Sequence, residues 1–531
     1  MSHRRYRVLT YIAFSFLFLI AFTSQSIFSQ QPEPSADAST PTIVSTTRIV
    51  TLDVVVTDAA GHPVANLNQE DFSVQEDGAP QKIAVFETPN LHLEANNNDS
   101  GSKDVVETSA TRPLTIIMLD EMNTKFENIV FARTAIKHFL EQHDGKLEQP
   151  TALMTLTNTN LVLVHDYTQN GKELITAVDH IPAMLPWHVQ KGTHLLDEAE
   201  RFVKTEGALH DVALASKGYP GRKNIIWLGS PFRKLSTVAG VDNSLRIQQS
   251  KDLSNLLLES HVTLYTIDPA GLQPMIPVDY AETYSGIGSL GGKGVVHSVS
   301  APGTIGAPGH TNFGLDTVAL ETGGQVVYEE NDIDRKLGTD VAEGNTYYTL
   351  AYYPSNHEWN GAFRKLKVQV NHPGYKVRAR LGYYGAATPA PPTAEEVRFE
   401  LARAVANPLT YTQTKLKAVA IGARNKDGHA QFTLQMDPAG LSWETLPNNN
   451  RACKVTVVVA ALSHDGEILH YTSQNVEGTS SSPHLDLNKT VSFKIDGLIP
   501  PKTASIRVVV RDSASGRIGS ANLTPPEMPQ T

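Results

Sequence analysis

A seven-residue apolar run that ends in a carboxylate, Leu114 to Asp120 (LTIIMLD), places the strongest constraint on the fold of this chain. An uninterrupted apolar run of this length is typical of a parallel strand that is covered on both faces. Asp120 closes the run, and open α/β sheets bind ligands at the carboxyl ends of their strands. The next residues, Glu121 to Thr124, are rich in side-chain oxygen, and a helical pattern of apolar residues follows them. The stretch predicts a buried strand, a candidate ligand loop and a helix.

Further apolar runs alternate with helical patterns over residues 113–344. Strands followed by helices in this way predict a doubly wound parallel sheet, the α/β part of the fold. A Gly-, Pro- and Ser-rich insertion at 271–309 interrupts the pattern. The predicted strands after the first are 151–157, 161–167, 224–228, 262–267 and 325–328.

The N-terminus has the layout of a secretory signal. Arg4, Arg5 and Arg7 precede an apolar run at 8–22, and a Ser- and Gln-rich stretch follows. We expect the remainder to be exported to the periplasm, to the outer surface or into the medium. An uncleaved single-span anchor is the alternative and would be the chain's only membrane contact, although 15 apolar residues are short for a full span.

Short strands flank the α/β segment on both sides. Each set has too few strands to bury a core alone, so we expect the two sets to pair into one β-sandwich with the α/β segment inserted into it. The segments predicted along the chain are a signal peptide at 1–30, a disordered leader at 31–42, an N-terminal β-module at 43–90, a linker at 91–112, a β-meander at 345–385, a Pro-rich linker at 386–395, an immunoglobulin-like β-sandwich at 396–522 and a tail at 523–531.

Net charge, cysteine content and the absence of known motifs argue against several classes of protein and site. The net charge of −10 argues against non-specific binding of nucleic acid, which needs a basic surface. Cys453 is the only cysteine, so the chain has no internal disulfide and no cysteine metal site. Neither Gly-x-Ser-x-Gly, nor a phosphate loop, nor His-Glu-x-x-His occurs in the sequence. We therefore expect a protein without enzymatic activity.

An ordered set of motifs resembles the VWFA-related acidobacterial domain family of exported bacterial proteins. Before the α/β segment the set comprises Thr57-Asp58, Gly61, Pro63-Val64, Asp71-Phe72 and Glu76-Asp77-Gly78. After it come Thr322-Gly323-Gly324, a tyrosine-rich strand, Phe363-Arg-Lys-Leu-Lys-Val368 and Val377-Arg-Ala-Arg-x-Gly-Tyr-Tyr384. The resemblance covers roughly residues 44–385. It implies export and a von Willebrand factor type A fold, and the family brings no enzymatic activity with it.

The same resemblance implies a divalent-metal site, with two departures from the pattern. The first loop of the type A fold reads Asp-x-Ser-x-Ser, and its positions fall on Asp120, Met122 and Thr124, of which Met122 offers no hard oxygen. A Gly-Thr pair supplies the second loop, and its match is Thr193. The third loop usually carries an acid, whereas this chain has Gly229-Ser230-Pro231.

The candidate metal residues are therefore Asp120, Thr124 and Thr193, with Asn123 and Glu121 as helpers for Mg²⁺ or Ca²⁺. In the alternative arrangement, Asp120 hydrogen-bonds backbone amides or Thr193 and the loop binds nothing.

We expect an exported, non-enzymatic protein of the adhesion type that binds an unidentified protein partner through a degenerate metal-dependent site. The alternative is a metal-free envelope scaffold that binds through its C-terminal β-sandwich.

Overall fold

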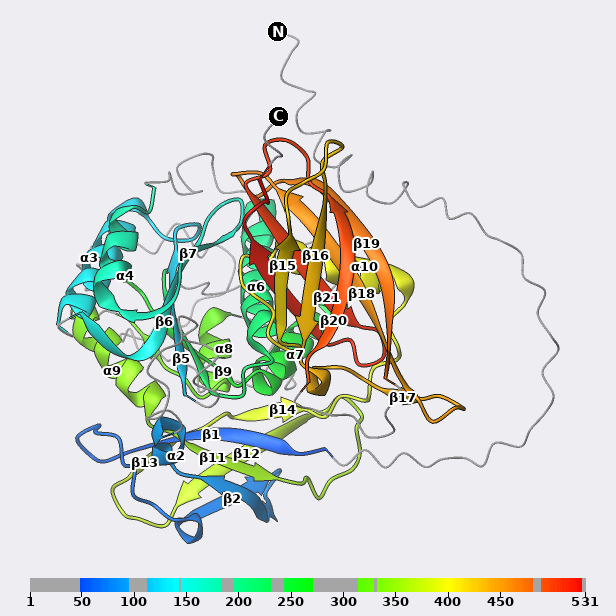
Figure 1. Cartoon of the computed structure of the whole chain (residues 1–531). Coiled ribbons are helices and arrows are strands. Elements are labelled where there is room, and N and C mark those ends of the chain that lie inside the picture. The colour runs from blue at the N-terminus through cyan, green and yellow to red at the C-terminus, as the bar shows by residue number, and fades with distance from the viewer. Residues whose placement is uncertain are drawn as a thin grey trace. The chain divides into compact units, whose positions relative to one another are not determined.

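The computed structural model describes residues 48–94, 112–142, 145–182, 195–230, 243–270, 314–328, 332–480 and 489–527. Several predicted features lie outside the described residues: the signal peptide at 1–30, the leader at 31–42, most of the first linker, the insertion at 271–309 and Thr193. The described part combines a mixed, largely parallel α/β sheet with antiparallel β-sheets (Figure 1).

The α/β domain is built on a 6-stranded sheet in the order β10-β9-β8-β5-β6-β7. Strands β5, β6, β8, β9 and β10 are parallel, and β7 runs antiparallel to β6 at one edge. This order places β5 at the centre of the sheet, where its seven residues are all buried. The strands are β5 (Leu114–Asp120), β6 (Lys146–Leu156), β7 (Leu161–Asn170), β8 (Lys223–Leu228), β9 (Val262–Ile267) and β10 (Val326–Val327).

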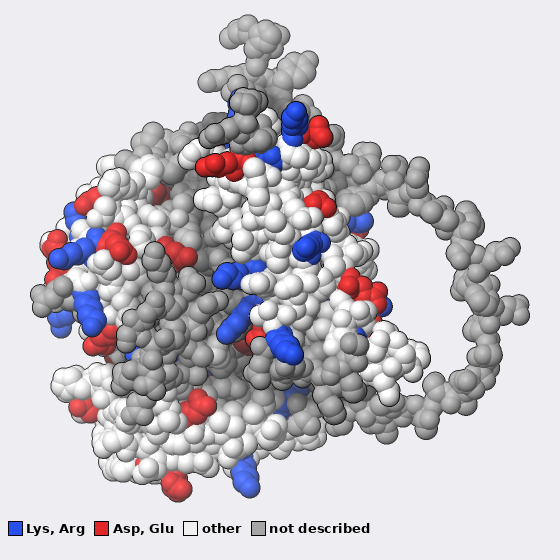
Figure 2. All heavy atoms as spheres, in the orientation of Figure 1, with Lys and Arg blue, Asp and Glu red and all other residues white. Residues whose placement is uncertain are grey.

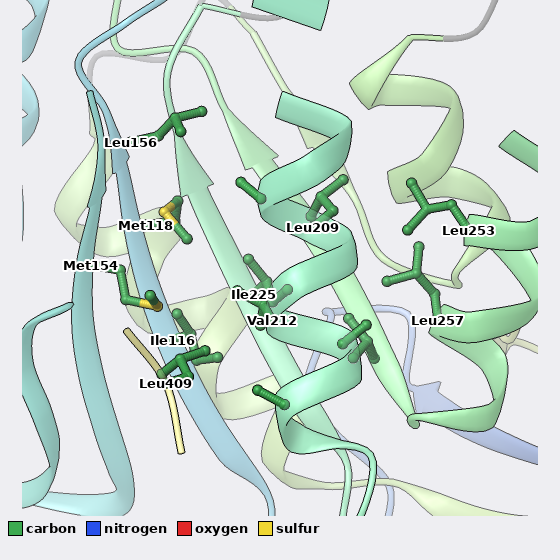
Figure 3. Packing of buried hydrophobic residues seen from close by; sticks show 14 of the residues in the cluster. Ile116, Met118, Met154, Leu156, Leu209, Val212, Ile225, Leu253, Leu257 and Leu409 are labelled. Atoms are coloured by element: carbon green, nitrogen blue, oxygen red, sulfur yellow. The ribbon is translucent and has the colours of Figure 1, made fainter. Parts of the chain in front are cut away.

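Helices cover both faces of this sheet because alternate residues of each strand point to opposite sides. Ile116 and Met118 of β5 pack against one group of helices, and Ile117 and Leu119 pack against the other. Figure 3 shows the first face, where Leu209 of α6 and its neighbours lie over the strands. The first group is α6 (Leu195–Ser216), α7 (Asn243–Glu259) and α8 (Leu315–Glu321); the second is α3 (Phe126–Glu141), α4 (Gly171–Asp179) and α9 (Ile333–Asn345).

Strands from both sides of the α/β domain share two antiparallel sheets, here called the first β-module. The sheet orders are β13-β1-β11-β4 and β14-β12-β2-β3, so each sheet mixes strands that lie far apart in sequence (Figure 1). Tyr348, Leu350 and Tyr352 of β11 join Leu52 and Val54 of β1 in the core. The elements are β1 (Val50–Thr57), η1 (Gln69–Asp71), β2 (Phe72–Glu76), β3 (Ala79–Gln81), β4 (Ile83–Glu87), α2 (Pro89–Glu94), β11 (Tyr348–Tyr352), β12 (Phe363–Val370), β13 (Lys376–Arg378) and β14 (Gly382–Tyr384).

The predicted β-meander at 345–385 is wrong. Strand β11 pairs with β1 and β4, whereas β12 pairs with β2 and β14 in the other sheet. The motif from Val377 to Tyr384 is divided between β13 and β14, which lie in different sheets. The two flanking sets of strands do pair with each other, as the sequence predicts, but the order of the strands within each sheet was not predicted. The predicted linker at 91–112 is also too long at its start, because α2 continues to Glu94.

The C-terminal module opens with α10 (Ala394–Ala406) and continues with antiparallel sheets in the orders β15-β16-β20 and β17-β18-β21-β22, while β19 also pairs with β18. Their facing apolar side chains form one core. The predicted tail at 523–531 begins too early, because β22 runs to Leu523 and the Glu527 carbonyl accepts a hydrogen bond from Arg424 N. The strands and the short helix are β15 (Leu416–Ile421), β16 (His429–Met436), η2 (Pro438–Gly440), β17 (Glu444–Thr445), β18 (Arg451–Leu462), β19 (Ile468–Ser480), β20 (Val491–Leu498), β21 (Ser505–Asp512) and β22 (Ile518–Leu523).

Helix α10 joins the C-terminal module to α6 of the α/β domain. The Arg403 guanidinium donates to the Asp211 carboxylate at 2.7 Å, and Asn407 Nδ2 donates to the Asp211 carbonyl at 3.0 Å. Leu401 and Ala404 belong to the same buried apolar cluster as the strands of the α/β sheet. These contacts fix α10 on the outer side of α6.

No helix among the described residues is long and apolar enough to cross a membrane.

Candidate functional site

Asp120 lies at the carboxyl end of the central strand, where the sequence predicts it, and its side chain turns inward. Only 1% of the residue is exposed. Its Oδ1 accepts the backbone N–H of Asn123 at 2.9 Å, and its Oδ2 accepts Asn123 Nδ2 at 2.7 Å. The indole Nε1 of Trp227, on the neighbouring strand β8, also donates to Oδ2 at 3.1 Å. Both carboxylate oxygens therefore face N–H donors from the protein.

Burial dominates the electrostatics of this carboxylate. It raises the pKa of Asp120 to about 6, against the opposing effect of the hydrogen bonds from Asn123 and Trp227. Desolvation disfavours the charged form, and hydrogen bonds to that form only partly offset the cost. Asp120 is thus a buried acid whose ionised form is stabilised by N–H groups.

The second candidate, Thr124, is also engaged within the protein. Its Oγ1 accepts the backbone N–H of Ser230 at 3.0 Å and so ties the loop after β5 to the loop after β8. Gly229 makes this approach possible, because a Cβ atom there would lie 2.5 Å from Asp120 Cβ. Where the type A pattern expects an acid, this chain has a glycine that lets two loops pack closely.

The proposed helpers point to other partners. Glu121 forms an ion pair with Arg133 of α3, and burial raises the pKa of its carboxyl despite that ion pair. Asn123 directs its amide nitrogen toward Asp120 and also donates to Thr205 Oγ1 at 3.2 Å, while its Oδ1 accepts Arg201 Nη1 at 3.5 Å. Met122 is completely buried in the core.

The side chains of the candidate site that the structure describes do not fit a divalent cation. Mg²⁺ and Ca²⁺ require converging oxygen lone pairs, and here N–H groups fill the positions around Asp120 while Thr124 accepts from a backbone amide. The described residues include no cluster of three or more His, Cys, Asp or Glu side chains that could hold a metal ion. Thr193 lies outside the described residues.

Trp227 is the residue of this site that sequence reasoning missed. It stands in the buried run of β8 and is fully buried. A buried indole N–H usually finds an acceptor, which is the one signal that points from Trp227 to a nearby carboxylate. The register of β5 and β8 brings the two residues together, because Trp227 is paired with Met118, two residues before Asp120.

Basic and acidic side chains are both present across the face shown in Figure 2. The one cysteine, Cys453, is buried, and burial raises the pKa of its thiol to about 11. A thiol of this kind is a weak nucleophile at neutral pH.

Comparisons with known proteins give weak likenesses. No family model and no curated protein matches the chain. Among solved structures, the SpRpn10 VWA domain aligns at 11% identity and TM-score 0.18, covering 30% of this chain and 75% of that domain. The TFIIH p34 N-terminal domain aligns at 11% identity and TM-score 0.17, covering 30% and 82%. A calcium-binding mutant of Bacteroides uniformis beta-glucuronidase 2 aligns at 11% identity and TM-score 0.14, and the match spans 19% of that enzyme and 35% of this chain. Likenesses at these scores assign neither a fold nor an activity.

Proposed function

We propose that this chain is an exported, non-enzymatic protein-binding protein of the adhesion type, whose von Willebrand factor A-like domain works without a metal ion. The observation that carries the proposal is the state of Asp120. Both of its oxygens accept N–H groups, from Asn123 and from Trp227, and the loop around it is closed by the Thr124–Ser230 hydrogen bond. A loop satisfied in this way suits a rigid scaffold better than a cation site or a reaction centre.

A cation-dependent form of the same function is the competing proposal. It would use Asp120, Thr124 and Thr193 for Mg²⁺ or Ca²⁺, as the resemblance to the type A fold implies. For this to hold, the Asn123 amide and the Trp227 indole would have to turn away from the carboxylate. The competing form therefore predicts that the cation rearranges the loop.

Thermal unfolding separates the two forms. A cation that binds only the folded chain must stabilise it by mass action. We expect the melting temperature of the chain to be the same in Mg²⁺, Mn²⁺, Ca²⁺ and chelator, and Asp120→Asn to be equally insensitive. A rise that depends on the cation and vanishes in Asp120→Asn would establish the metal-dependent form.

Binding itself is tested with the immobilised chain and solubilised cell-envelope proteins, in chelator and in Mg²⁺. We expect a saturable partner that is retained equally in both buffers and that free chain competes away. Retention only in Mg²⁺ would overturn the metal-free part of the proposal. Absence of any saturable partner in either buffer would overturn the binding function.

A further inference from the structure

A groove with apolar walls lies where three helices meet, two from the α/β domain and one from the C-terminal module. Helices α6, α7 and α10 line an open groove of about 710 Å³, within the usual size range of ligand pockets in proteins. The ion pair between Arg403 and Asp211 holds α10 against α6 on one side. The groove thus exists only because the two modules pack together.

The most exposed large hydrophobic side chains of the described residues both line this groove. Phe399 of α10 is 68% exposed and Val203 of α6 is 58% exposed, and the remaining exposed large hydrophobics are all lower. Leu253 of α7, labelled in Figure 3, is buried beneath them, and Leu256 lies beside it half-buried. Single exposed apolar residues need no explanation, but two from distant elements at one groove indicate a contact surface.

The charges around the groove are predominantly acidic. Its lining includes the carboxylates of Glu206, Asp252 and Glu400, of which Glu400 forms an ion pair with Arg511 at 2.7 Å. The lining cation Arg403 already pairs with Asp211 at 2.7 Å, so its charge is offset. Asp252 is exposed, and its carboxylate accepts a hydrogen bond from the neutral amide of Gln248 at 2.9 Å. A ligand that places cations at this rim would meet complementary charge.

We propose that this groove docks a segment of a partner protein that carries a large apolar side chain flanked by Lys or Arg. The apolar side chain would pack between Phe399 and Val203 onto Leu253, and a flanking cation would lie at Asp252. Interfaces of this kind concentrate binding energy in a central aromatic or aliphatic contact surrounded by polar residues. The inference rests on the proposed protein-binding function and names its surface and the chemistry of its partner.

Selection of peptides from a random phage-displayed library on the full chain tests the proposal. We expect the enriched sequences to carry Phe, Leu or Trp flanked by Lys or Arg. A labelled peptide of the enriched sequence should bind about tenfold or more weakly to Phe399→Ser. Asp252→Lys should weaken it and flatten the salt dependence of its affinity. Both changes are at exposed positions, and circular dichroism of the variants is the check that they fold.

Phe126→Ser is the matched control, because Phe126 is a helical phenylalanine on α3 that is 44% exposed. It should bind the peptide like the unmodified chain. Enrichment of acidic peptides, or equal binding by Phe399→Ser and the unmodified chain, would overturn the groove as the docking site. If the chain still retains an envelope partner in that case, the binding function stands and only its location is wrong.

Discussion

Asp120 makes the stability of the chain depend on pH in a direction that can be calculated. Burial raises its pKa from the usual 3.8 to about 6 in the folded chain. The folded state then holds the proton over a range in which the unfolded state has lost it. The stabilising contribution is fully present below pH 3.8 and is lost as the pH rises through about 6.

The size of the effect follows from the shift. Roughly two pKa units at about 1.4 kcal/mol each amount to about 3 kcal/mol of folding free energy lost across this range. Asp120→Asn removes the titration, so its free energy of unfolding should gain about 3 kcal/mol relative to the unmodified chain between about pH 4 and about pH 8. Urea unfolding of both proteins in chelator, followed across this range, measures the difference.

Other buried groups do not disturb the comparison. Burial also raises the pKa of Asp340 to about 6, but Asp340 is present in both proteins and cancels in the difference. A difference that stays constant within about 0.5 kcal/mol would refute the burial argument for Asp120. A slope that reverses when Mg²⁺ replaces chelator would refute the metal-free loop, since a bound cation favours the ionised carboxylate.

Three further substitutions test contacts around the site and the core. Trp227→Phe removes the N–H donor to the Asp120 carboxylate and should cost about 1.5–3 kcal/mol at neutral pH, measured by the same urea unfolding, and less near pH 4. Glu76→Gln leaves the buried Arg364 without its counter-charge and should cost about 3–5 kcal/mol, seen as a lower melting temperature. Thr393→Ala removes the capping box of α10 and should cost about 1 kcal/mol, seen as faster amide exchange confined to α10.

The sequence located the centre of the α/β domain well because its signal is local. The predicted strand at Leu114–Asp120 has the observed bounds. A strand covered on both faces is apolar at every position, so its length and limits can be read without knowing its neighbours. The alternation of such strands with helices likewise gave the mixed α/β character of the fold.

The burial of side chains in the first β-module could not be predicted in this way. Side chains alternate along a strand, so one tyrosine of an adjacent pair should face away from the core, yet Tyr347, directly before β11, and Tyr348 are both buried. Tyr348 packs in the β-module core, whereas Tyr347 accepts the backbone N–H of Arg222 and stacks on His92. The second face is covered by the α/β domain, a contact that no local pattern encodes.

In the candidate site, too, the sequence predicted local features but not contacts between strands. The sequence placed Asp120 at the end of its strand and identified the oxygen-bearing residues of the loop. It did not show that the donors to that carboxylate would come from Asn123 and from Trp227 on another strand. Ligand residues can be matched to a motif, but the groups that compete with a ligand depend on packing between strands.

Insertion of the α/β domain into the first β-module determines which of its surfaces stay available. The chain enters the domain at the amino end of β5 and leaves it through α9, so the β-module must lie at the amino edge of the parallel sheet. Contacts there are polar: the buried Arg222 N donates to Tyr347 Oη at 3.2 Å, and the half-buried His261 lies 3.4 Å from the Asp53 carboxylate.

The C-terminal module covers part of the α6 face through α10. No described residue of the β-module lines the groove, although β14 contacts α7 nearby, where Asn255 Nδ2 donates to the Tyr384 carbonyl at 3.0 Å. A partner can reach the groove without contacting the Asp120 loop. The surface that we assign to the partner therefore does not depend on Asp120.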